Sequence, residues 1–488
     1  MPHGSDAANL TGTPVDAKRS SARGYDMQYH GTAELRGGNC PRSRYYDKGR
    51  FGRLFPSLPP FTPDPAALAQ LGAKGGPMDG SAPNTNPDHP NNLPPGFTFL
   101  GQFVDHDITF DPTSSLERQS DPEAVENFRT PLLELDSMYG SGPGASPHLY
   151  QRADRDLLLV GKDTADGPND LPRNPEGTAL LGDPRNDENL IISQLHLAMI
   201  KFHNAVARRV KNSPPAAGGI FETAQRVVRW HYQWMLVHEF IPAIVGQPLV
   251  TDVLTNGAKF YKPRHEPFIP VEFSVAAYRF GHSQIRPGYR INAAFAAPLF
   301  VAPPQPVDPN ELPKDLSGGR RIVPDQKVDW HNFFTIGGQV PGAPGKRFDT
   351  ELSPPLMNLP AFSNAAGDPS SLAQRNLMRG VTFGLPCGQD VAGAMGVQPL
   401  TPEQLGQAAI DLGFAEQTPL WFYILKEADV GGGATLGAVG GRIVAEVLLG
   451  LLLGDRQSYL RAAPNWKPFL GSNQQFGMAD LLRIAEVL

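Results

Sequence analysis

Cysteine is scarce in this chain: Cys40 and Cys387 are the only two among 488 residues. Two thiols form at most one disulfide, so the fold does not depend on a disulfide framework. A large excess of one charge is also missing, because 43 basic residues face 49 acidic ones. Since no basic run is interleaved with aromatic residues, the sequence predicts no nucleic-acid partner.

Long apolar runs are missing as well. The most apolar stretch, residues 443–453, is too short to cross a bilayer and predicts a core helix. Residues 1–24 hold no apolar central region of the kind that a secretory signal needs. The sequence therefore predicts no transmembrane segment, and a protein that is either cytoplasmic or exported without an N-terminal signal.

Glycine and proline, by contrast, are abundant, with 51 and 50 residues spread through the chain without a period. This composition predicts turn-rich loops. Strand patterns are few and short, whereas helical periodicity recurs and predicts a mainly α fold. The predicted helices cover residues 96–108, 188–212, 222–245, 271–281, 371–379, 402–412, 416–427 and 439–453.

The chain divides into an N-terminal arm and one large domain. Residues 1–90 are mostly polar or rich in Gly, Pro and Asn, and we expect them to pack on the core as an arm. The apolar side chains that would attach the arm are Phe51, Leu54, Phe55 and Phe61. Residues 91–488 are long enough to form a single large domain with a sizeable core.

The segment GQFVDHD, at residues 101–107, places unusual polar groups inside an apolar run. At about 100° per residue, Gln102, Asp105 and His106 share one face of the predicted helix. Asp107 points away from that face and is available to a different site. Burying so many polar groups without a partner is unfavourable, so this segment predicts a bound ligand.

Two other segments carry polar residues that need an explanation. GDPRNDEN, at 182–189, precedes the helix predicted for 188–212, and Asp187 and Glu188 suit the start of that helix. Helix initiation does not account for Arg185. YRFGH, at 278–282, ends an apolar stretch, where a single histidine such as His282 is more often a core residue than a ligand. None of the segments is decisive alone.

Together the segments resemble the animal haem peroxidases of the peroxidase–cyclooxygenase superfamily, a family that also has bacterial members. The resemblance spans roughly residues 100–390 and implies a large, mainly α, single-domain haem peroxidase fold with few short strands and long loops. The matching motifs follow the family's order and are GQFVDHD (101–107), TPLLELDSMYG (130–140), GDPRNDEN (182–189) with HN (203–204), RFGH (279–282) and RNLMRGVTFGLPCGQD (375–390).

The resemblance implies a catalytic trio on the distal side of haem b. His106 matches the histidine that takes a proton from hydrogen peroxide and returns it to the departing oxygen. Arg185 matches the arginine whose permanent charge stabilises the developing negative charge. Gln102 matches the glutamine that holds water or peroxide by hydrogen bonds.

On the other side of the haem, His282 matches the proximal iron ligand. The resemblance suggests Asn358, in the segment SPPLMN, as the hydrogen-bond partner of the second ring nitrogen of His282. Arg279 matches an arginine near a haem propionate, and an ordinary salt bridge is an equally good interpretation of this residue.

Asp105 and Glu188 stand where mammalian members carry ester bonds to the haem, so the resemblance allows a covalently bound haem. For Glu188, helix initiation remains the alternative. The chain has Asn189 where mammalian myeloperoxidase has a methionine linked to the haem. A sulfonium link is therefore excluded at that position, and efficient chloride oxidation is not expected.

The resemblance also implies a calcium site. Its ligands would be oxygens, as a hard cation prefers, and a solvated acidic loop is the alternative interpretation. The matching residues are Asp107, Thr130, Leu132 (through its carbonyl), Glu134 and Asp136. Animal members usually carry Asp and Ser where Glu134 and Asp136 stand. Because Asp107 adjoins His106, the ion would help to fix the distal helix.

The function implied is a haem peroxidase in the response to oxidative stress, which reduces hydrogen peroxide through an oxyferryl intermediate. Its small donors would be phenols, iodide, bromide or thiocyanate. One alternative is a haem-dependent fatty-acid dioxygenase, whose radical tyrosine typically lies three residues before the proximal histidine; here Arg279 holds that position and Tyr278 precedes it. The other is a non-catalytic adhesion protein, against which the complete set of His106, Arg185 and His282 argues.

Overall fold

The structure is a computed structural model, and its described part is mainly helical, as the sequence predicts. The described residues are 51–81, 93–110, 127, 129–162, 167, 169–212, 219–263, 267–301, 314–360 and 369–488. Cys40 and the rest of residues 1–50 of the expected arm lie outside them. Every candidate site residue named above lies within them.

Helices provide nearly all the regular structure of the described residues. The α-helices are α3 (Pro65–Leu71), α4 (Gly96–Ile108), α5 (Asp136–Tyr139), α6 (Gly142–Ala145), α7 (Leu190–Lys211), α8 (Ile220–Met235), α9 (Ile241–Val245), α10 (Gln247–Asn256), α11 (Leu372–Thr382), α12 (Gly388–Met395), α13 (Pro402–Leu405), α14 (Gln407–Asp411), α15 (Leu420–Val430), α16 (Ala438–Gly454), α17 (Tyr459–Ala462) and α18 (Met478–Ile484).

Two pairs of very short strands complete the described part. Strand β1 (Phe51–Gly52) runs parallel to β2 (Ile269–Pro270), and β3 (Gly288–Arg290) runs antiparallel to β4 (Ala296–Pro298). In the second pair Tyr289 lies opposite Ala297. Each pair of strands connects loop segments by a few hydrogen bonds. Neither pair is part of a larger sheet in the described residues.

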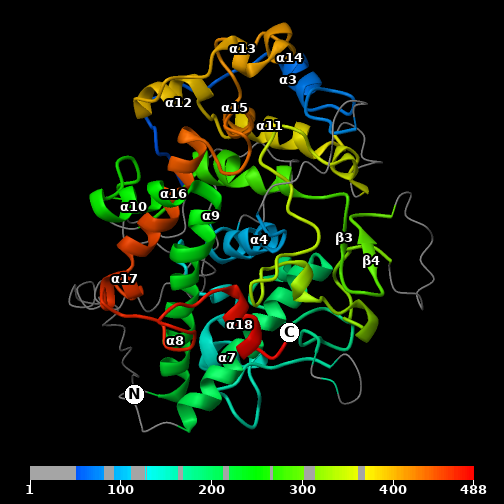
Figure 1. Cartoon of the computed structure of the whole chain (residues 1–488), viewed down its shortest axis with the longest axis vertical. Coiled ribbons are helices and arrows are strands. Elements are labelled where there is room, and N and C mark those ends of the chain that lie inside the picture. The colour runs from blue at the N-terminus through cyan, green and yellow to red at the C-terminus, as the bar shows by residue number, and fades with distance from the viewer. Residues whose placement is uncertain are drawn as a thin grey trace, which may run out of the picture.

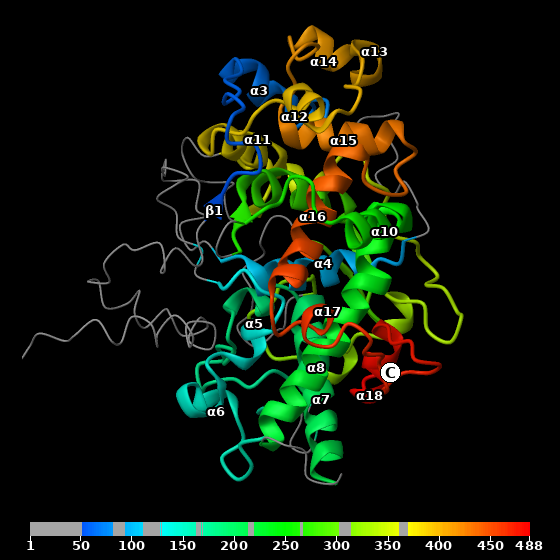
Figure 2. The same ribbon diagram turned by 90° about the vertical axis from the view of Figure 1, so that its left-hand side faces the viewer.

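Helix α4 lies in the middle of the molecule, between two groups of helices (Figures 1 and 2). Helices α3 and α11–α15 gather at one end, whereas α5–α8 and α18 lie toward the other. Most residues of α4 are buried, and the helix packs against α7 and against the 3₁₀ helix η5 (Ala277–Gln284). The two segments that carry His106 and His282 are therefore neighbours in space.

The helix predicted for 222–245 is a continuous column built from α8, the π-helical turn η3 (Leu236–Phe240) and α9 (Figure 1). Its apolar face packs on α7 and α16. Helix α16, the apolar stretch noted in the sequence, is a buried core helix, as predicted. No helix in the described part of the chain is long and apolar enough to span a membrane.

The helix predicted for 271–281 is a different structure. A π-helical turn, η4 (Glu272–Ala276), is followed by η5, and the backbone leaves the helical region at Ala276 (φ −125°, ψ −75°). Tertiary hydrogen bonds take over here: Trp421 donates to the carbonyl of Arg279 over 3.2 Å, and Tyr278 donates to that of Gly101 over 3.2 Å. These contacts outweigh the local helical periodicity.

Glycine and proline explain two smaller differences. The helix predicted for 402–412 is divided into α13 and α14 at Gly406, whose φ of +92° is incompatible with a continuous helix. The helix predicted for 416–427 begins only at Leu420, after Pro419, because proline lacks the N–H of a helix interior but is tolerated at its start.

The described part of the N-terminal arm lies on the helical body. Leu54 and Phe55 are buried, and their backbone N–H groups donate to the two carboxylate oxygens of Glu272 over 3.0 and 3.1 Å. Phe51 and Phe61 are only partly buried against the same core. This packing fixes the start of η4, and η4 leads directly into the segment of His282.

Candidate active site

Helix α4 faces the 3₁₀ helix η2 (Pro184–Asp187) and the residue that follows it, and this contact brings the predicted distal residues together. Gln102 hydrogen-bonds to the carboxylate of Glu188. Asp105 lies 3.8 Å from Nη1 of Arg185. His106 is buried, and its Nδ1 lies 2.8 Å from Oδ1 of Asn186. The three side chains on one face of α4 thus meet three residues of one short distant segment, Arg185, Asn186 and Glu188.

Asn186 is a site residue that the sequence analysis did not identify. Its Nδ2 lies 2.9 Å from Nδ1 of His196, so its Oδ1 is directed at His106. An amide oxygen only accepts hydrogen bonds, so Nδ1 of His106 carries the proton and Nε2 keeps its lone pair. The available signal was the position of Asn186 in GDPRNDEN, next to Arg185.

The neutral state of His106 follows from its surroundings. Burial and, to a smaller extent, the positive charge of Arg185 lower the pKa of His106 to about 4. His196 is buried beneath Asn186, and burial lowers its pKa to about 3. At neutral pH, His106 is therefore a free base.

Arg185 is held in place by Asp183 and by a backbone carbonyl. Its Nη2 lies 2.8 Å from Oδ2 of Asp183 and also donates to the carbonyl of Thr109. Burial opposes ionisation of Asp183, but the hydrogen bond and charge of Arg185 and the charge of Arg129 outweigh it and lower the pKa of this carboxyl. The fully buried Asp183 is thus an ionised anchor that orients Arg185.

The proximal side corrects one sequence expectation. Nδ1 of His282 lies 2.7 Å from Nδ2 of Asn376, on α11, whereas Asn358 is exposed at the end of the 3₁₀ helix η8 (Pro354–Met357). The partner of His282 is therefore Asn376 and not Asn358. Asn376 lies in the motif RNLMRG, whereas SPPLMN is a short and weak match.

Arg279 joins the same group from the turn before His282. Its Nη1 donates to Oδ1 of Asn376 over 3.1 Å, and its Nε donates to the carbonyl of Ser274 over 3.1 Å. Burial, together with the charge of Arg279, lowers the pKa of His282 to about 3. His282 is neutral at physiological pH, as a metal-binding imidazole must be.

We infer a recess between α4 and η5 from two partly accessible but strongly desolvated residues. His282 is only half-buried and Glu188 is exposed, yet burial lowers the pKa of His282 and raises the pKa of Glu188 to about 7. Accessible surface combined with strong desolvation is expected of side chains that line a deep recess. Gln102, Asp105 and Arg185 are likewise only partly covered.

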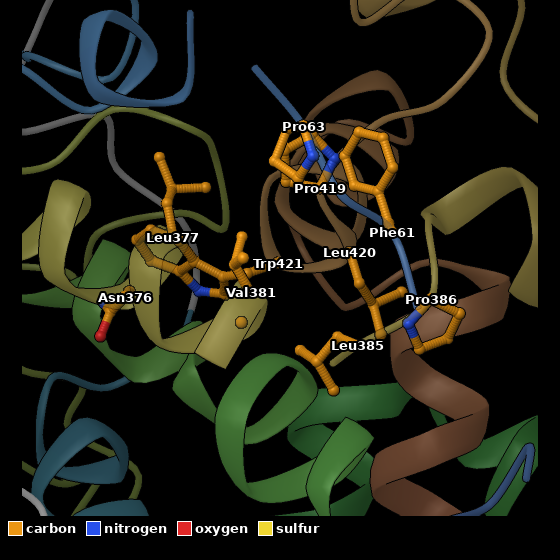
Figure 3. Close-up of a pocket in the computed structure, with 11 residues that line it drawn as sticks. Phe61, Pro63, Asn376, Leu377, Val381, Leu385, Pro386, Pro419, Leu420 and Trp421 are labelled. Atoms are coloured by element: carbon orange, nitrogen blue, oxygen red, sulfur yellow. The ribbon is translucent and has the colours of Figure 1, made fainter. Parts of the chain in front are cut away.

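A small apolar pocket lies on the other side of Asn376 (Figure 3). It is lined by Leu377, Leu420 and Trp421 among others, and its volume of about 20 Å³ admits little more than one water molecule. The pocket is too small for a substrate. Asn376 and Trp421 form part of its wall, and both contact η5, Asn376 through His282 and Trp421 through the carbonyl of Arg279.

Three buried acids lie beside the distal helix. Asp107 is fully buried and neither of its carboxylate oxygens has a hydrogen-bond partner; one oxygen each of Glu134 and Asp136 also has none. Burial and the charge of Asp136 raise the pKa values of Asp107 and Glu134 well above normal. Two cations lie near these acids: Arg129, with Nη1 3.5 Å from Oδ2 of Asp136, and Arg229, whose charge lowers the pKa of Glu134. In the described ranges, no group of three or more His, Cys, Asp or Glu side chains is arranged closely enough to hold a metal ion.

The other two predicted calcium ligands lie in the same loop. Thr130 and Leu132 are buried and are joined by a hydrogen bond of 2.7 Å from the N–H of Leu132 to the carbonyl of Thr130. Leu135 has a left-handed backbone (φ 66°), an uncommon conformation for a residue other than glycine. This local bend separates Glu134 from the start of α5 at Asp136.

Comparison with known proteins identifies the family. The profile of the animal haem peroxidase family matches residues 117–387, more than half of the chain. The chain therefore belongs to the animal haem peroxidase family, a class of haem-dependent peroxidase. This confirms the resemblance and the fold class expected from the sequence.

Individual relatives agree with this assignment. The dual oxidase of Drosophila melanogaster is 34% identical over 116 residues, which cover 23% of this chain and 7% of that protein. The chain spans less than a quarter of the length of the curated relatives that it matches. Peroxidase A from Dictyostelium discoideum has a similar structure, with a TM-score of 0.60, 16% identity, and 89% of this chain and 95% of that chain covered.

The fold is also shared with a different enzyme. The Oryza sativa fatty acid alpha-dioxygenase aligns with a TM-score of 0.54 and 16% identity, covering 81% of this chain and 73% of that chain. At this sequence identity, the two structural likenesses establish only the fold. The type of reaction has to be inferred from the site residues.

Proposed function

We propose that this protein reduces hydrogen peroxide at a haem held between α4 and η5, and that it oxidises small donors. The donors we propose are phenols, iodide, bromide and thiocyanate. One observation carries the proposal: Asn186 fixes His106 as a neutral base beside Arg185, while Asn376 holds a second neutral histidine on the facing segment. Membership of the peroxidase family supports peroxide and a reductant as substrates.

The residues around the recess fit haem b. Asn376 faces Nδ1 of His282, so Nε2 is the nitrogen that is left for iron. Because the amide nitrogen of Asn376 donates to Nδ1 here, iron at Nε2 would require the proton of His282 to move to Nδ1 and the amide to turn its oxygen toward it. Arg279 lies where its guanidinium could meet a propionate. A haem bound here would supply the redox iron at which the O–O bond of peroxide is cleaved.

On the distal side, proton transfer belongs to His106. Its Nε2 takes the proton from one peroxide oxygen and returns it to the other oxygen, which then leaves as water. The amide oxygen of Asn186 stabilises the imidazolium that exists between these two transfers, because it accepts the hydrogen bond from Nδ1.

Arg185 and Gln102 orient and stabilise the reacting oxygens. Asp183 and Thr109 fix the guanidinium of Arg185, so little reorganisation is needed when negative charge develops on the departing oxygen. The amide of Gln102 is held between Glu188 and Asn189, whose Nδ2 donates to its Oε1 over 3.2 Å. We propose that Gln102 positions peroxide or water by hydrogen bonding.

Covalent attachment of the haem is a further part of the proposal. The carboxylates of Asp105 and Glu188 both lie among the candidate site residues. Asp105 is near Arg185, and Glu188 accepts a hydrogen bond from Gln102. Esters from these two carboxylates would fix the haem within the recess. Asn189 caps α7 through its side-chain oxygen and offers no sulfur for a third link.

We also propose a structural calcium ion. The unpartnered oxygens of Asp107, Glu134 and Asp136 suit a hard divalent cation, which would remove the mutual repulsion of these acids. Thr130 and the Leu132 carbonyl would complete the ligand set. Through Arg129, which contacts both Asp136 and Asp183, the ion would also stabilise the anchor of Arg185.

Fatty-acid dioxygenation is the second candidate, and the structural likeness to the rice enzyme supports it only at the level of the fold. The hydroxyl of Tyr278 is buried and donates to the carbonyl of Gly101, on the distal helix. Together with Arg185 beside His106, this engaged tyrosine favours peroxidase chemistry.

The test is spectroscopic. Protein expressed with a haem supply should show a Soret band that changes when peroxide is added and returns when iodide or a phenol follows. No Soret band would overturn the proposal. Oxygen uptake with a long-chain fatty acid, without oxidation of any donor by peroxide, would instead establish the dioxygenase.

A further inference from the structure

Three of the five tryptophans of the chain gather in one place, together with a tyrosine. Trp466 is the centre of this tryptophan cluster, with ring centroids 5.5 Å from Trp230, 6.1 Å from Trp234 and 5.7 Å from Tyr459. Trp234 and Tyr459 are 5.6 Å apart. Every ring of the tryptophan cluster therefore contacts at least one other ring that can be oxidised.

The cluster joins two segments that are far apart in sequence. Trp230 and Trp234 belong to α8, whereas Tyr459 begins α17, which packs against α8 (Figures 1 and 2). The indole of Trp230 donates to the carbonyl of Gln457 over 2.9 Å, and the N–H of Tyr459 donates to Oε1 of Gln233 over 3.1 Å. These hydrogen bonds fix the rings relative to one another.

The cluster extends from the interior to the surface. Trp234 and Tyr459 are buried, whereas Trp230 and Trp466 are only partly covered. Phe469, which is 62% exposed, has its ring centroid 6.4 Å from that of Trp466. Together these two rings offer an aromatic surface on which a phenol can stack.

Helix α8 also connects the cluster with the proposed haem recess. Tyr232, two residues before Trp234, is buried, and its ring centroid lies 6.4 Å from that of Phe103. Phe103 belongs to α4, between Gln102 and His106. Aromatic side chains of α8 therefore reach from the distal helix on one face to the tryptophan cluster on the other.

Tyr459 has a proton acceptor. Its hydroxyl lies 3.3 Å from Nε2 of His238, whose ring stacks on Trp234 with centroids 3.8 Å apart. Burial and the nearby charge of Lys467 lower the pKa of His238 to about 4, so its imidazole is neutral at physiological pH. Nζ of Lys467 lies 4.9 Å above the Trp234 ring, and this positive charge disfavours a cation radical on Trp234.

We propose that the tryptophan cluster is a second oxidation site, which takes electrons from phenolic donors too large to enter the haem recess. The inference rests on the proposed function, because haem oxidised by peroxide is the oxidant. Tyr459 gives one electron to the oxidised haem and its phenolic proton to His238. The tyrosyl radical then takes one electron from Trp466 and regains its proton from His238, and the oxidised Trp466 takes one electron from a donor stacked on it. The donor loses its own proton to water and leaves as a phenoxyl radical, so one peroxide oxidises two donors.

The experiment uses the haem-loaded protein and detects radicals directly. Peroxide is added without a donor but with a nitroso spin trap, and tryptic peptides are then searched for adducts by mass spectrometry. We expect adducts on Tyr459 and Trp466, and a tyrosyl signal in freeze-quenched electron paramagnetic resonance spectra that is lost in Tyr459→Phe. Trp330→Phe is the matched control, because Trp330 is a buried tryptophan that packs against Phe333, outside the cluster.

A pair of donors supplies the second measurement. Trp466→Phe should lose most of the oxidation of a polymer-linked phenol and retain oxidation of iodide, whereas Trp330→Phe should retain both. Retained iodide oxidation also shows that the variant is folded and holds haem. Adducts confined to residues outside the cluster, or full oxidation of the polymer-linked phenol by Trp466→Phe, would overturn the inference. Failure of the wild type to bind haem or react with peroxide would overturn the proposed function itself.

Discussion

Oδ1 of Asn186 lies 2.8 Å from Nδ1 of His106, and the same amide lies 2.9 Å from His196 through its Nδ2. The contact with His196 fixes the orientation of the amide, and that orientation fixes which ring nitrogen of His106 is protonated. The basicity of Nε2 therefore depends on two buried residues that never touch peroxide.

Asn186→Ala should slow the reaction with peroxide by about 10- to 100-fold, the range typical when a histidine loses the group that orients it. Haem binding should be retained, because His282 is unchanged. Stopped-flow measurement of the Soret change against peroxide concentration gives the rate constant. Asn212→Ala, at the exposed C-terminal cap of α7, is the control, and an unchanged rate in Asn186→Ala would show that His106 needs no orienting partner.

His106→Leu and His282→Ala should separate catalysis from binding of the haem. Loss of the proposed general base should slow the peroxide reaction by about 10²- to 10⁴-fold while the Soret band remains. Loss of the proposed iron ligand should instead reduce the haem content of the purified protein. Both effects are read from one absorbance spectrum and one stopped-flow trace for each variant, and His331→Ala, at a partly exposed residue outside the candidate site, is the control. Haem retained in His282→Ala at full occupancy would argue against His282 as the ligand.

The corrected proximal partner gives a sharp comparison between two asparagines. With haem iron on Nε2, the proton of His282 would sit on Nδ1 and the amide of Asn376 would turn its oxygen to accept it. Asn376→Ala should then raise the Fe(III)/Fe(II) potential, because the imidazole loses the hydrogen bond that makes it a stronger donor to iron. Asn358→Ala should leave the potential unchanged, since Asn358 is exposed at the end of η8. Potentiometric titration of the haem spectrum measures both, and a shift in Asn358→Ala alone would restore the original assignment.

Local periodicity was sufficient to predict which side chains share one face of α4 in the candidate site. Gln102, Asp105 and His106 share a helix face because 3.6 residues make a turn, and the structure places all three against residues 185–188. The mainly α fold was predictable for the same reason. The partners across the recess depend on tertiary packing, and only the family motifs made Arg185 and His282 visible in the sequence.

Asn376 and η5 show what periodicity cannot provide. Asn376 meets His282 because α11 packs against η4 and contacts between these elements join residues about a hundred positions apart. The segment of His282 reads as an ordinary amphipathic helix, yet hydrogen bonds from Trp421 and Tyr278 accompany a 3₁₀ helix there. Both features depend on residues that are distant in sequence.

Removal of calcium should destabilise the protein and disturb the distal side. Glu134 and Asp136 line a cleft of about 630 Å³, which gives a chelator a route to the proposed ion. A ligand present at 100 times its dissociation constant stabilises a fold by about 2.7 kcal/mol, so EDTA should lower Tm and added calcium should restore it. Glu134→Gln should weaken this response, whereas Glu416→Gln, on an exposed loop, should not. An identical Tm with EDTA and with calcium would show that the acids hold no ion.

Glu188 predicts how the stability of the haem-free protein varies with pH. Burial raises the pKa of its carboxyl from 4.5 to about 7, so the folded chain binds this proton more tightly than the unfolded chain does. The free energy of unfolding should therefore fall as pH rises from about 4.5 to about 7, and this contribution should be constant above that window. Glu188→Gln removes the ionisation, so the variant should gain stability relative to the wild type between pH 5 and 8. Urea unfolding of both proteins across this range measures the difference, in which other titrating groups cancel. A difference that is independent of pH, or one that favours the wild type at pH 8, would show that Glu188 is not desolvated in the recess.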